Sequence, residues 1–250
     1  MRTRLAAASK EDRLLLVGLP ILTVLLLIGW AIWGTLADFD DIEARLLTWS
    51  NIGVLTWQHL RIVVVSAAIV VAAAVPIGVL LTRRGLRAAS PVVVGIANAG
   101  QAAPVIGVIV LLALTLGFGF WIAVLSLTLY AFLPVLANTI TGLRGVDASL
   151  VEAARGMGMS SAQVLFRVEL PLAIPVIMTG VRTALVLLVG AGAFATFIDA
   201  GGLGLLIQTG IVMFRYSILV SGAILVAALA MAVEWFGRLL EIFVKPGGLS

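Results

Sequence analysis

The sequence contains no cysteine, only one histidine (His59), and little charge of either sign. Without cysteine the chain forms no disulfide and offers no thiolate for catalysis or metal binding. A single histidine argues against a histidine-based metal site or proton relay. Charged residues make up 11% of the chain, whereas soluble domains carry about 25%. The chain therefore has few side chains suited to catalysis and too few charged residues to cover the surface of a soluble domain.

Motifs for common chemistry are also absent. No Gly-x-x-x-x-Gly-Lys-Ser/Thr sequence occurs, so the chain lacks the usual loop that holds ATP phosphates. There are no paired carboxylates, nucleophile triads or metal-spaced histidines, and Gly201-Gly202-Leu203-Gly204, which follows an apolar run, is interpreted as a tight turn. We expect a chain that is not an enzyme and binds no cofactor or metal itself.

Long apolar runs dominate instead. Hydrophobic residues make up 62% of the chain and the mean hydropathy is +1.21. About 20 apolar helical residues cross ~30 Å of hydrocarbon. The sequence therefore predicts an all-α integral membrane protein with about six transmembrane helices, over residues 14–36, 62–81, 91–116, 121–143, 173–198 and 217–240.

Two further segments are too short or too polar to cross. The amphipathic stretch Leu46–Leu60, which follows an acidic cluster, is expected to lie along the outer interface as a short helix. Leu205–Met213 is expected to form a re-entrant or interfacial helix. Val75-Pro76-Ile77-Gly78 should bend the second span near its inner end.

Lysine and arginine orient these spans, because cytoplasmic loops carry an excess of both. Of the 16 basic residues, only Arg45, Arg61 and Arg215 fall in segments that this layout places outside. We therefore expect a cytoplasmic N-terminus (1–13), a first span with an external segment (14–61), a core domain (62–240) with a cytoplasmic loop (144–172), and a cytoplasmic C-terminus (241–250). The net charge of +4 lies in short loops and does not indicate nucleic-acid binding.

Polar and small residues inside the spans have local interpretations. Arg182 lies near the inner end of its span, where its side chain could snorkel to the surface, and Glu234 lies one turn from Arg238, which predicts an ion pair. Gly180, Gly190 and Gly192 would allow neighbouring helices to approach closely.

The loop 144–172 predicts two short helices with a sharp corner between them. Either Asp147 or Ser149 can cap the first helix, and Ser149-x-x-Glu152 has the spacing of a capping box. Gly156 and Gly158 are expected to end it, because glycine accepts the left-handed conformation of a C-terminal cap.

The second helix of this loop has its own start and stop signals. Ser160 and Gln163 repeat the capping-box spacing, and Pro171 is expected to stop the helix. Two capped amphipathic helices at a membrane surface indicate a docking element for another protein. The alternative is an ordinary loop that only connects two spans.

A family resemblance rests on this loop. Glu152-Ala153-Ala154, three residues, Gly158, nine residues, Val168, one residue and Leu170-Pro171 resemble the cytoplasmic signature of binding-protein-dependent ABC importer permeases, with valine where isoleucine is usual. The resemblance implies coupling helices that seat in an ATPase subunit. It assigns ATPase docking to Glu152, Ala153, Ala154, Arg155, Gly156, Gly158, Leu170 and Pro171.

A narrower resemblance covers residues 59–210 approximately. These blocks are similar to osmoprotectant importer permeases of the glycine betaine, carnitine, choline and proline betaine type, although residues 102–106 depart from that pattern. The blocks are His59-Leu60 with Ser66, Val75–Gly78, Ile96-Ala97-Asn98-x-x-Gln101, Leu133–Leu136 with Asn138-Thr139, Glu152–Gly158, Gly180–Ala184 and Ala200–Gly204.

The resemblance also implies partners and a place. The chain would act in the cell membrane of a prokaryote with a second, identical or homologous permease chain, two ATPase subunits that bind ATP and Mg²⁺, and an external solute-binding protein. Candidates for the lining of the passage are Asn98, Gln101, Tyr130, Phe132, Asn138 and Thr139. Each of them has an alternative interpretation as a hydrogen-bonding or packing residue between helices.

Other functions stay open at this point. An ABC permease could carry another small solute, such as an amino acid. An ion-coupled carrier or channel would need buried acidic pairs, which the sequence does not offer.

Overall fold

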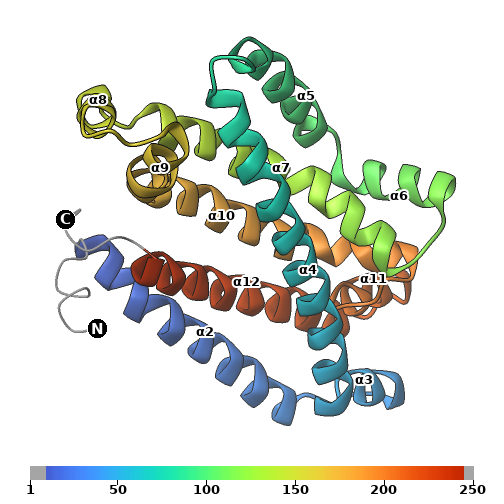
Figure 1. Cartoon of the computed structure of the whole chain (residues 1–250). Coiled ribbons are helices and arrows are strands. Elements are labelled where there is room, and N and C mark those ends of the chain that lie inside the picture. Colours follow the sequence, from blue (N-terminus) through green and yellow to red (C-terminus); the bar gives the residue numbers. More distant parts are fainter. Residues whose placement is uncertain (1–9, 245–250) are drawn as a thin grey trace.

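The computed structural model describes residues 10–244, all of whose regular elements are helical (Figure 1). The α-helices are α2 (Lys10–Leu36), α3 (Asp41–Leu46), α4 (Trp49–Thr82), α5 (Ser90–Ala102), α6 (Val105–Leu116), α7 (Phe120–Arg144), α8 (Ala148–Gly156), α9 (Ser161–Val164), α10 (Leu170–Gly192), α11 (Gly204–Val212) and α12 (Tyr216–Val244). Short 3₁₀ turns are η1 (Arg87–Ala89) and η3 (Ala193–Ile198), and η2 (Leu165–Glu169) is a π turn.

The prediction of an all-α membrane protein is confirmed. Five helices in the described residues are long and apolar enough to cross a membrane, and the bent pair α5–α6 gives a sixth span if it is counted as one. The helices α7 and α12 match the predicted spans closely, and α11 is the predicted short helix. Most of the predicted terminal segments 1–13 and 241–250 lies outside the described residues.

The centre of the protein is formed by α4, α7 and α10. Their contact buries a continuous apolar cluster that includes Ile62, Leu127 and Leu188. A Cβ atom at Gly180 of α10 would lie 2.7 Å from the Cβ of Asn138 on α7, so the two helices need glycine there.

Gly190 and Gly192, the other two glycines expected to help packing, differ in how close the neighbouring atoms lie. Gly192 lies against the buried ring of His59, and a Cβ at Gly192 would come within 2.9 Å of the His59 Nε2 atom. Gly190 has no neighbouring atom within 4 Å of such a position. The packing prediction is therefore right for Gly180 and Gly192 and wrong for Gly190.

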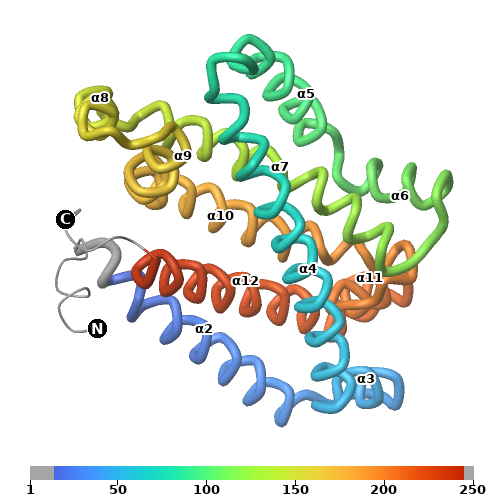
Figure 2. Tube along the Cα trace, viewed as in Figure 1, coloured from blue at the N-terminus to red at the C-terminus, as the bar shows by residue number. Residues whose placement is uncertain are grey.

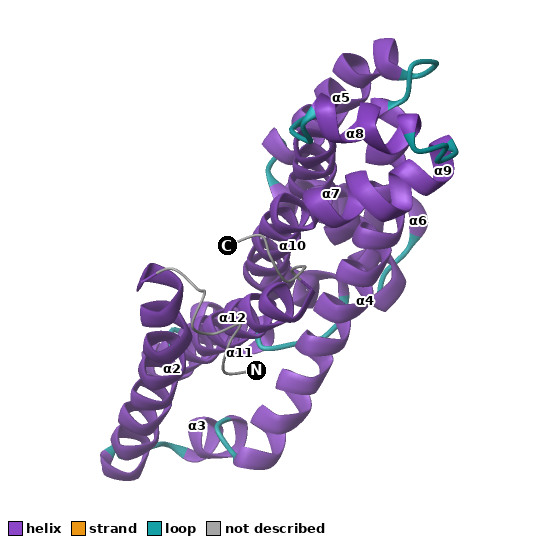
Figure 3. Cartoon of the chain, turned by 60° about the vertical axis from the view of Figure 1, so that its left-hand side comes forward, coloured by secondary structure: helices purple, strands orange, loops and turns teal. Residues whose placement is uncertain are grey.

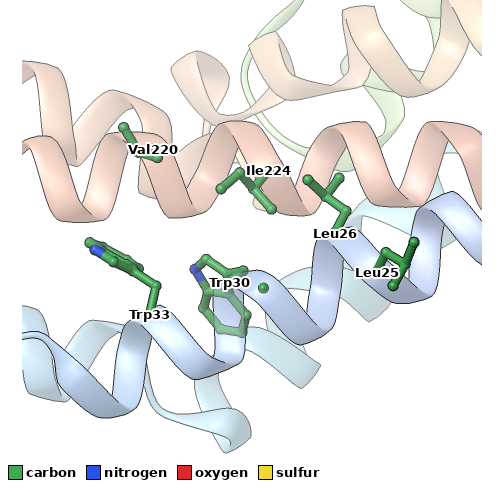
Figure 4. A pocket seen from close by; sticks show the side chains of 7 residues that line it. Leu25, Leu26, Trp30, Trp33, Val220 and Ile224 are labelled. Atoms are coloured by element: carbon green, nitrogen blue, oxygen red, sulfur yellow. The ribbon is translucent and has the colours of Figure 1, made fainter.

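The first helix, α2, lies at the edge of the molecule alongside α12 (Figure 3). Two indole N–H groups form hydrogen bonds between α2 and α12. Trp30 of α2 donates to the hydroxyl of Ser221 at 2.9 Å. Trp235 of α12 donates to the carbonyl of Leu16 at 2.9 Å. Around Trp30 the two helices leave an apolar groove of about 340 Å³, which is lined in part by Trp30, Trp33 and Ile224 (Figure 4). Most of α2 is exposed, as expected of a helix that faces lipid.

The predicted interfacial helix over residues 46–60 is wrong. Residues 49–60 instead form the beginning of α4, a single helix of 34 residues that contains Pro76 without a break. The reason is a shared buried face, because Ile52, Leu55 and Ile62 follow one another at helical spacing and all pack inward.

The predicted third span, residues 91–116, is not one helix. It is broken into α5 and α6, which meet at 95° (Figure 2). Proline at 104 has no N–H to donate and disfavours the helical conformation of the preceding residue, and Ala103 is accordingly extended, with φ −65° and ψ 142°.

The expected stop at Pro171 is also wrong. The chain passes from α9 through the π turn η2 into α10, and residues 161–198 form one apolar helical run. Proline is tolerated in the first turn of α10, where its missing N–H costs little. Pro175, expected at a helix start, consequently lies inside a helix.

Candidate docking loop and passage

The first helix of the loop 144–172 is capped by Asp147 and not by Ser149. The Asp147 carboxylate accepts a hydrogen bond from the backbone N–H of Ser149 at 2.8 Å, and this bond lowers the pKa of Asp147. The capping box between Ser149 and Glu152 is therefore not formed, because Ser149 already lies inside α8. A carboxylate at this position also suits the positive end of the helix dipole.

The corner after α8 has the geometry of a Schellman motif. The N–H of Met159 donates to the carbonyl of Ala154 at 3.2 Å, and the N–H of Gly158 donates to that of Arg155 at 2.9 Å. Gly158 has φ +83°, so the predicted left-handed glycine is confirmed there. Gly156 is the last residue of α8 and has no such φ.

The second helix begins as predicted. The Ser160 hydroxyl accepts from the Gln163 N–H at 3.4 Å, while the Gln163 side chain accepts from the Ser160 N–H at 2.8 Å. This capping box starts α9, whose Val164 is buried. The main contacts of α8 are with α9 and η2, so the two short helices form one projecting unit.

The eight residues assigned to docking divide into two groups. Exposed residues are Glu152, Ala153, Arg155, Gly156 and Gly158. Ala154 is buried, and Leu170 and Pro171 are half-buried at the start of α10. The first group forms a surface that a partner can reach, and the second holds the unit to the membrane helices.

An ion pair fastens this unit to α4. The Arg83 guanidinium donates to the carboxylate of Glu169, in the π turn, at 2.6 Å. Sequence reasoning missed this pair, because 86 residues separate its members. The sequence did contain a signal for this pair. Glu169 stands alone just before Leu170-Pro171, and the segment after α4 holds several arginines and no acidic residue.

The six candidates for the passage lie on two neighbouring helices, α5 and α7. On α5, Asn98 is exposed and Gln101 is half-buried. On α7, Asn138 is half-buried and its amide donates to the Pro134 carbonyl at 2.8 Å.

The remaining three candidates on α7 pack more deeply. Tyr130 and Phe132 are half-buried against the central apolar cluster. Thr139 is fully buried, donates to the Val135 carbonyl at 2.7 Å and lies against Gly78 of α4. The packing interpretation therefore accounts for Thr139 in this chain.

The charged residues near the C-terminal end of α12 form a network. The predicted pair between Glu234 and Arg238 is present at 2.8 Å. Arg182 of α10 pairs with Glu234 at 3.3 Å and with Glu241 at 2.6 Å, and its snorkelling stays a prediction. Gly237 makes room for the stem of Arg182, since a Cβ at Gly237 would lie 2.9 Å from the Arg182 Cγ. The network joins α10 to α12.

The N-terminal half of α4 holds the glycine turn that follows η3. Gly201 and Gly202 have φ +80° and +101°, which confirms the predicted break of the chain. The Gln58 side-chain oxygen accepts from the Gly202 N–H at 3.1 Å, and the buried His59 donates from Nε2 to the Val189 carbonyl at 2.9 Å. Residues 58 and 59 were not assigned this role from the sequence.

Across the described residues, no group of histidine and acidic side chains has the geometry to hold a metal ion. A cavity of about 400 Å³ lies between α10, η3, α11 and α12 and is lined mainly by apolar side chains, with Phe194, Phe197 and Gln208 among them. The structure thus combines membrane helices, a projecting two-helix loop and a polar pair that ties the loop to α4. These features are those of a helical membrane protein with a two-helix loop that projects from its membrane spans.

The family follows from comparison with known proteins. The family model described as "Binding-protein-dependent transport system inner membrane component" matches residues 74–245. The chain belongs to this family and is a permease subunit of an ABC importer. It is therefore a multi-pass membrane protein, and its α2, α3 and most of α4 lie outside the matched region.

Several characterised relatives are similar over most of their length. The carnitine transport permease protein OpuCB of Listeria monocytogenes is 40% identical over 196 residues, which cover 78% of this chain and 89% of the relative. The choline transport system permease protein OpuBB of Bacillus subtilis is 37% identical, with the same coverage. The osmoprotectant import permease protein OsmW of Salmonella typhimurium is 36% identical over 215 residues, or 84% of this chain and 99% of the relative.

A solved structure supports the fold. One chain of the MetNI methionine ABC transporter, in an inward-facing crystal form, aligns with a TM-score of 0.70 and 24% identity over 83% of this chain and 100% of that chain. At this identity the likeness shows that the two chains share a fold.

Proposed function

We propose that this permease carries a small quaternary-ammonium osmoprotectant, such as glycine betaine, choline, carnitine or proline betaine. The observation that carries the proposal is the 36–40% identity to permeases named for carnitine, choline and osmoprotectants, over most of their length. The alternative of an amino acid has weaker support, because the methionine transporter chain is only 24% identical.

The exposed surface of α8 docks into an ATPase subunit in this proposal. ATP and Mg²⁺ bind to that partner, and hydrolysis takes place there. The support is geometric, since Glu152 and Arg155 are exposed on a helix that is fixed at both ends by Asp147 and Gly158. A rigid exposed helix loses little conformational freedom on binding.

The complete transporter contains two permease chains, two ATPase subunits and an external binding protein. The loop 144–172 and both termini lie in the cytoplasm, and Asp41 and Gly202 lie outside. Figure 1 supports this arrangement, because α8 and α9 lie on the left of the view, where α2 begins and α12 ends, whereas α3 and α11 lie on the right.

Asn98, Gln101 and Asn138 face the interior of the assembled transporter in this proposal, with Tyr130 and Phe132 nearby. Exposed amides in hydrocarbon cost several kcal/mol each, and Asn98 is exposed in the single chain. A second permease chain or a water-filled passage would satisfy it. A structure of the complex with all three amides against acyl chains would contradict the passage.

The test is reconstitution in liposomes with the cognate binding protein and ATPase. Uptake of labelled choline, carnitine and glycine betaine should require ATP inside and binding protein outside, and labelled methionine should serve as the control solute. Uptake of methionine alone would refute the osmoprotectant assignment. Solute flux without the ATPase would refute ATP-driven import in favour of a carrier or channel.

A further inference from the structure

The projecting unit formed by α8, α9 and η2 meets the membrane helices through a small set of contacts. Its main contact with them is between η2 and α10, to which η2 is directly joined. An ion pair between Glu169 and Arg83, at 2.6 Å, joins this unit to α4. Apart from its short covalent link to α7 through residues 145–147, α8 is connected to the membrane helices mainly by way of η2.

The ion pair lies beside an apolar cluster that reinforces it. Leu143, Ala173 and Ile177 are buried, and Val75 and Val79 of α4 pack against this cluster together with Leu165 and Leu170 from the loop side. The same inner segment of α4 thus contacts the π turn through both a charged and an apolar contact. Arg83 is the C-cap residue of α4, so the ion pair connects the π turn to the end of that helix.

The junction between the loop and α10 contains a π turn, η2. In η2 the N–H of Leu170 donates to the carbonyl of Leu165, five residues earlier, in place of the usual four. A π turn accommodates an extra residue in a helix, and such turns occur often at functional sites. Glu169, the last residue of this turn, is buried and hydrogen-bonded.

The other end of α4 reaches the outer side. A helix of 34 residues spans about 50 Å at ~1.5 Å per residue. Near its outer end, Gln58 accepts from the Gly202 N–H at 3.1 Å and His59 contacts the Val189 carbonyl at 2.9 Å. One helix therefore connects the docking unit to the turn that closes the outer end of α10.

We propose that the Arg83–Glu169 pair transmits the movement of the docking unit to α4, and through α4 to the Gln58–Gly202 contact. The proposal rests on the proposed function, in which α8 docks into an ATPase. Arg83 and Glu169 are positioning residues, because they touch neither the solute nor ATP. In this proposal the transmission depends on the two residues having opposite charges, more than on which of them carries which charge.

The experiment uses the reconstituted complex of permease, ATPase and binding protein. It measures solute imported per ATP hydrolysed and, separately, the amount of ATPase that co-purifies. Arg83→Gln and Glu169→Gln should each lower the transport ratio by about twofold to thirtyfold, the range expected for residues that couple distant sites. ATPase co-purification should stay at the wild-type level, because the exposed face of α8 is unchanged.

Three controls separate this role from a merely structural one. The charge-exchanged double variant Arg83→Glu with Glu169→Arg should recover much of the ratio, and Arg83→Lys, which keeps the positive charge, should lie close to wild type. Arg84→Gln removes the neighbouring exposed charge, for which the described residues show no ion pair, and should leave the ratio unchanged.

Unchanged coupling in both single variants would overturn the proposal. So would an equal fall in the Arg84→Gln control, or a loss of transport that merely follows a loss of bound ATPase. The proposed function fails by a different result, namely a wild-type permease that binds no ATPase. The two failures are therefore distinguishable.

Discussion

The two ends of α4 hold their neighbouring segments in different ways. At the C-terminal end of α4, Arg83 holds the π turn by an ion pair with Glu169 at 2.6 Å, next to an exposed, capped helix. At its N-terminal end, Gln58 accepts a hydrogen bond from the Gly202 N–H of the glycine turn, and the fully buried His59 hydrogen-bonds to the Val189 carbonyl of α10. Either contact is costly to leave unmade, because Glu169 is a buried carboxylate and the Gly202 N–H is a buried donor. The two ends differ in what makes the contact, namely complementary charges at one end and hydrogen bonds to backbone groups at the other.

The largest expected effect is at the outer glycine turn. Gly202→Val would place a β-branched side chain at φ +101°, with its Cβ only 3.3 Å from the Nδ1 atom of His59. Backbone strain and overpacking together should destabilise the fold by about 3 kcal/mol. Thermal unfolding of the purified protein in detergent should show a clear loss of stability.

Gly85→Val is the matched control for this comparison. Gly85 lies in the loop after α4, where a Cβ would meet nothing within 4 Å, and no positive φ is required there. Its unfolding should stay close to wild type. Equal destabilisation by the two substitutions would show that the outer turn is not specially constrained.

The second effect concerns the corner of the docking loop. Gly158→Val introduces strain of about 1–3 kcal/mol at φ +83°, but its side chain would enter open space. We expect a normally folded permease with reduced ATPase co-purification and reduced uptake. The apolar spans are untouched, so membrane insertion should be normal.

Gly156→Val sharpens that prediction. Gly156 is also exposed and unobstructed, but it lies at the end of α8 without a positive φ. It should therefore lose less ATPase binding than Gly158→Val. Undiminished binding and uptake in Gly158→Val would contradict the coupling role of the loop.

These comparisons also show what the sequence can predict. Local signals were sufficient for α7, the Ser160–Gln163 capping box and the left-handed Gly158, because each depends on residues close in the chain. Packing between distant segments overrode local signals in other places. Residues 49–60 joined α4 because their apolar face continues that of the span.

Proline was the least reliable local signal. Pro104 breaks the predicted third span at 95°, whereas Pro171 was expected to stop a helix and does not. The outcome depends on whether the neighbouring turn can satisfy the freed carbonyl, which the sequence alone does not reveal. The Arg83–Glu169 and Arg182–Glu241 pairs were missed for a related reason, since they join helices far apart in the chain.

A third, smaller effect is expected from Gln58→Ala. This change leaves the buried Gly202 N–H without its partner, which costs about 1–3 kcal/mol. Thermal unfolding should show a loss smaller than that of Gly202→Val. If Gln58→Ala is silent, while Arg83→Gln lowers coupling, the outer contact is not part of the path along α4.

The smallest effect is expected at the start of α8. Asp147→Asn should weaken ATPase binding less than Gly158→Val, because asparagine is also a good helix cap. Accepting the Ser149 N–H bond lowers the pKa of Asp147 in the folded protein. Its contribution is thus present above the pKa of the unfolded chain and is lost as the pH falls through the folded pKa.

That pH dependence provides its own measurement. ATPase binding by wild type should approach that of Asp147→Asn in acid and exceed it at neutral pH. An identical dependence for both proteins would mean that the Asp147 carboxylate does not stabilise the docked helix.

The central claim is that the α8 surface faces the cytoplasm and meets the ATPase. Because the chain has no cysteine, single cysteines can be introduced without background and labelled with a membrane-impermeant thiol reagent. In intact cells, Asp41→Cys should be labelled and Arg155→Cys should not; in opened membranes Arg155→Cys should be labelled, and added ATPase should protect it. Labelling of Arg155→Cys from outside intact cells would contradict the account.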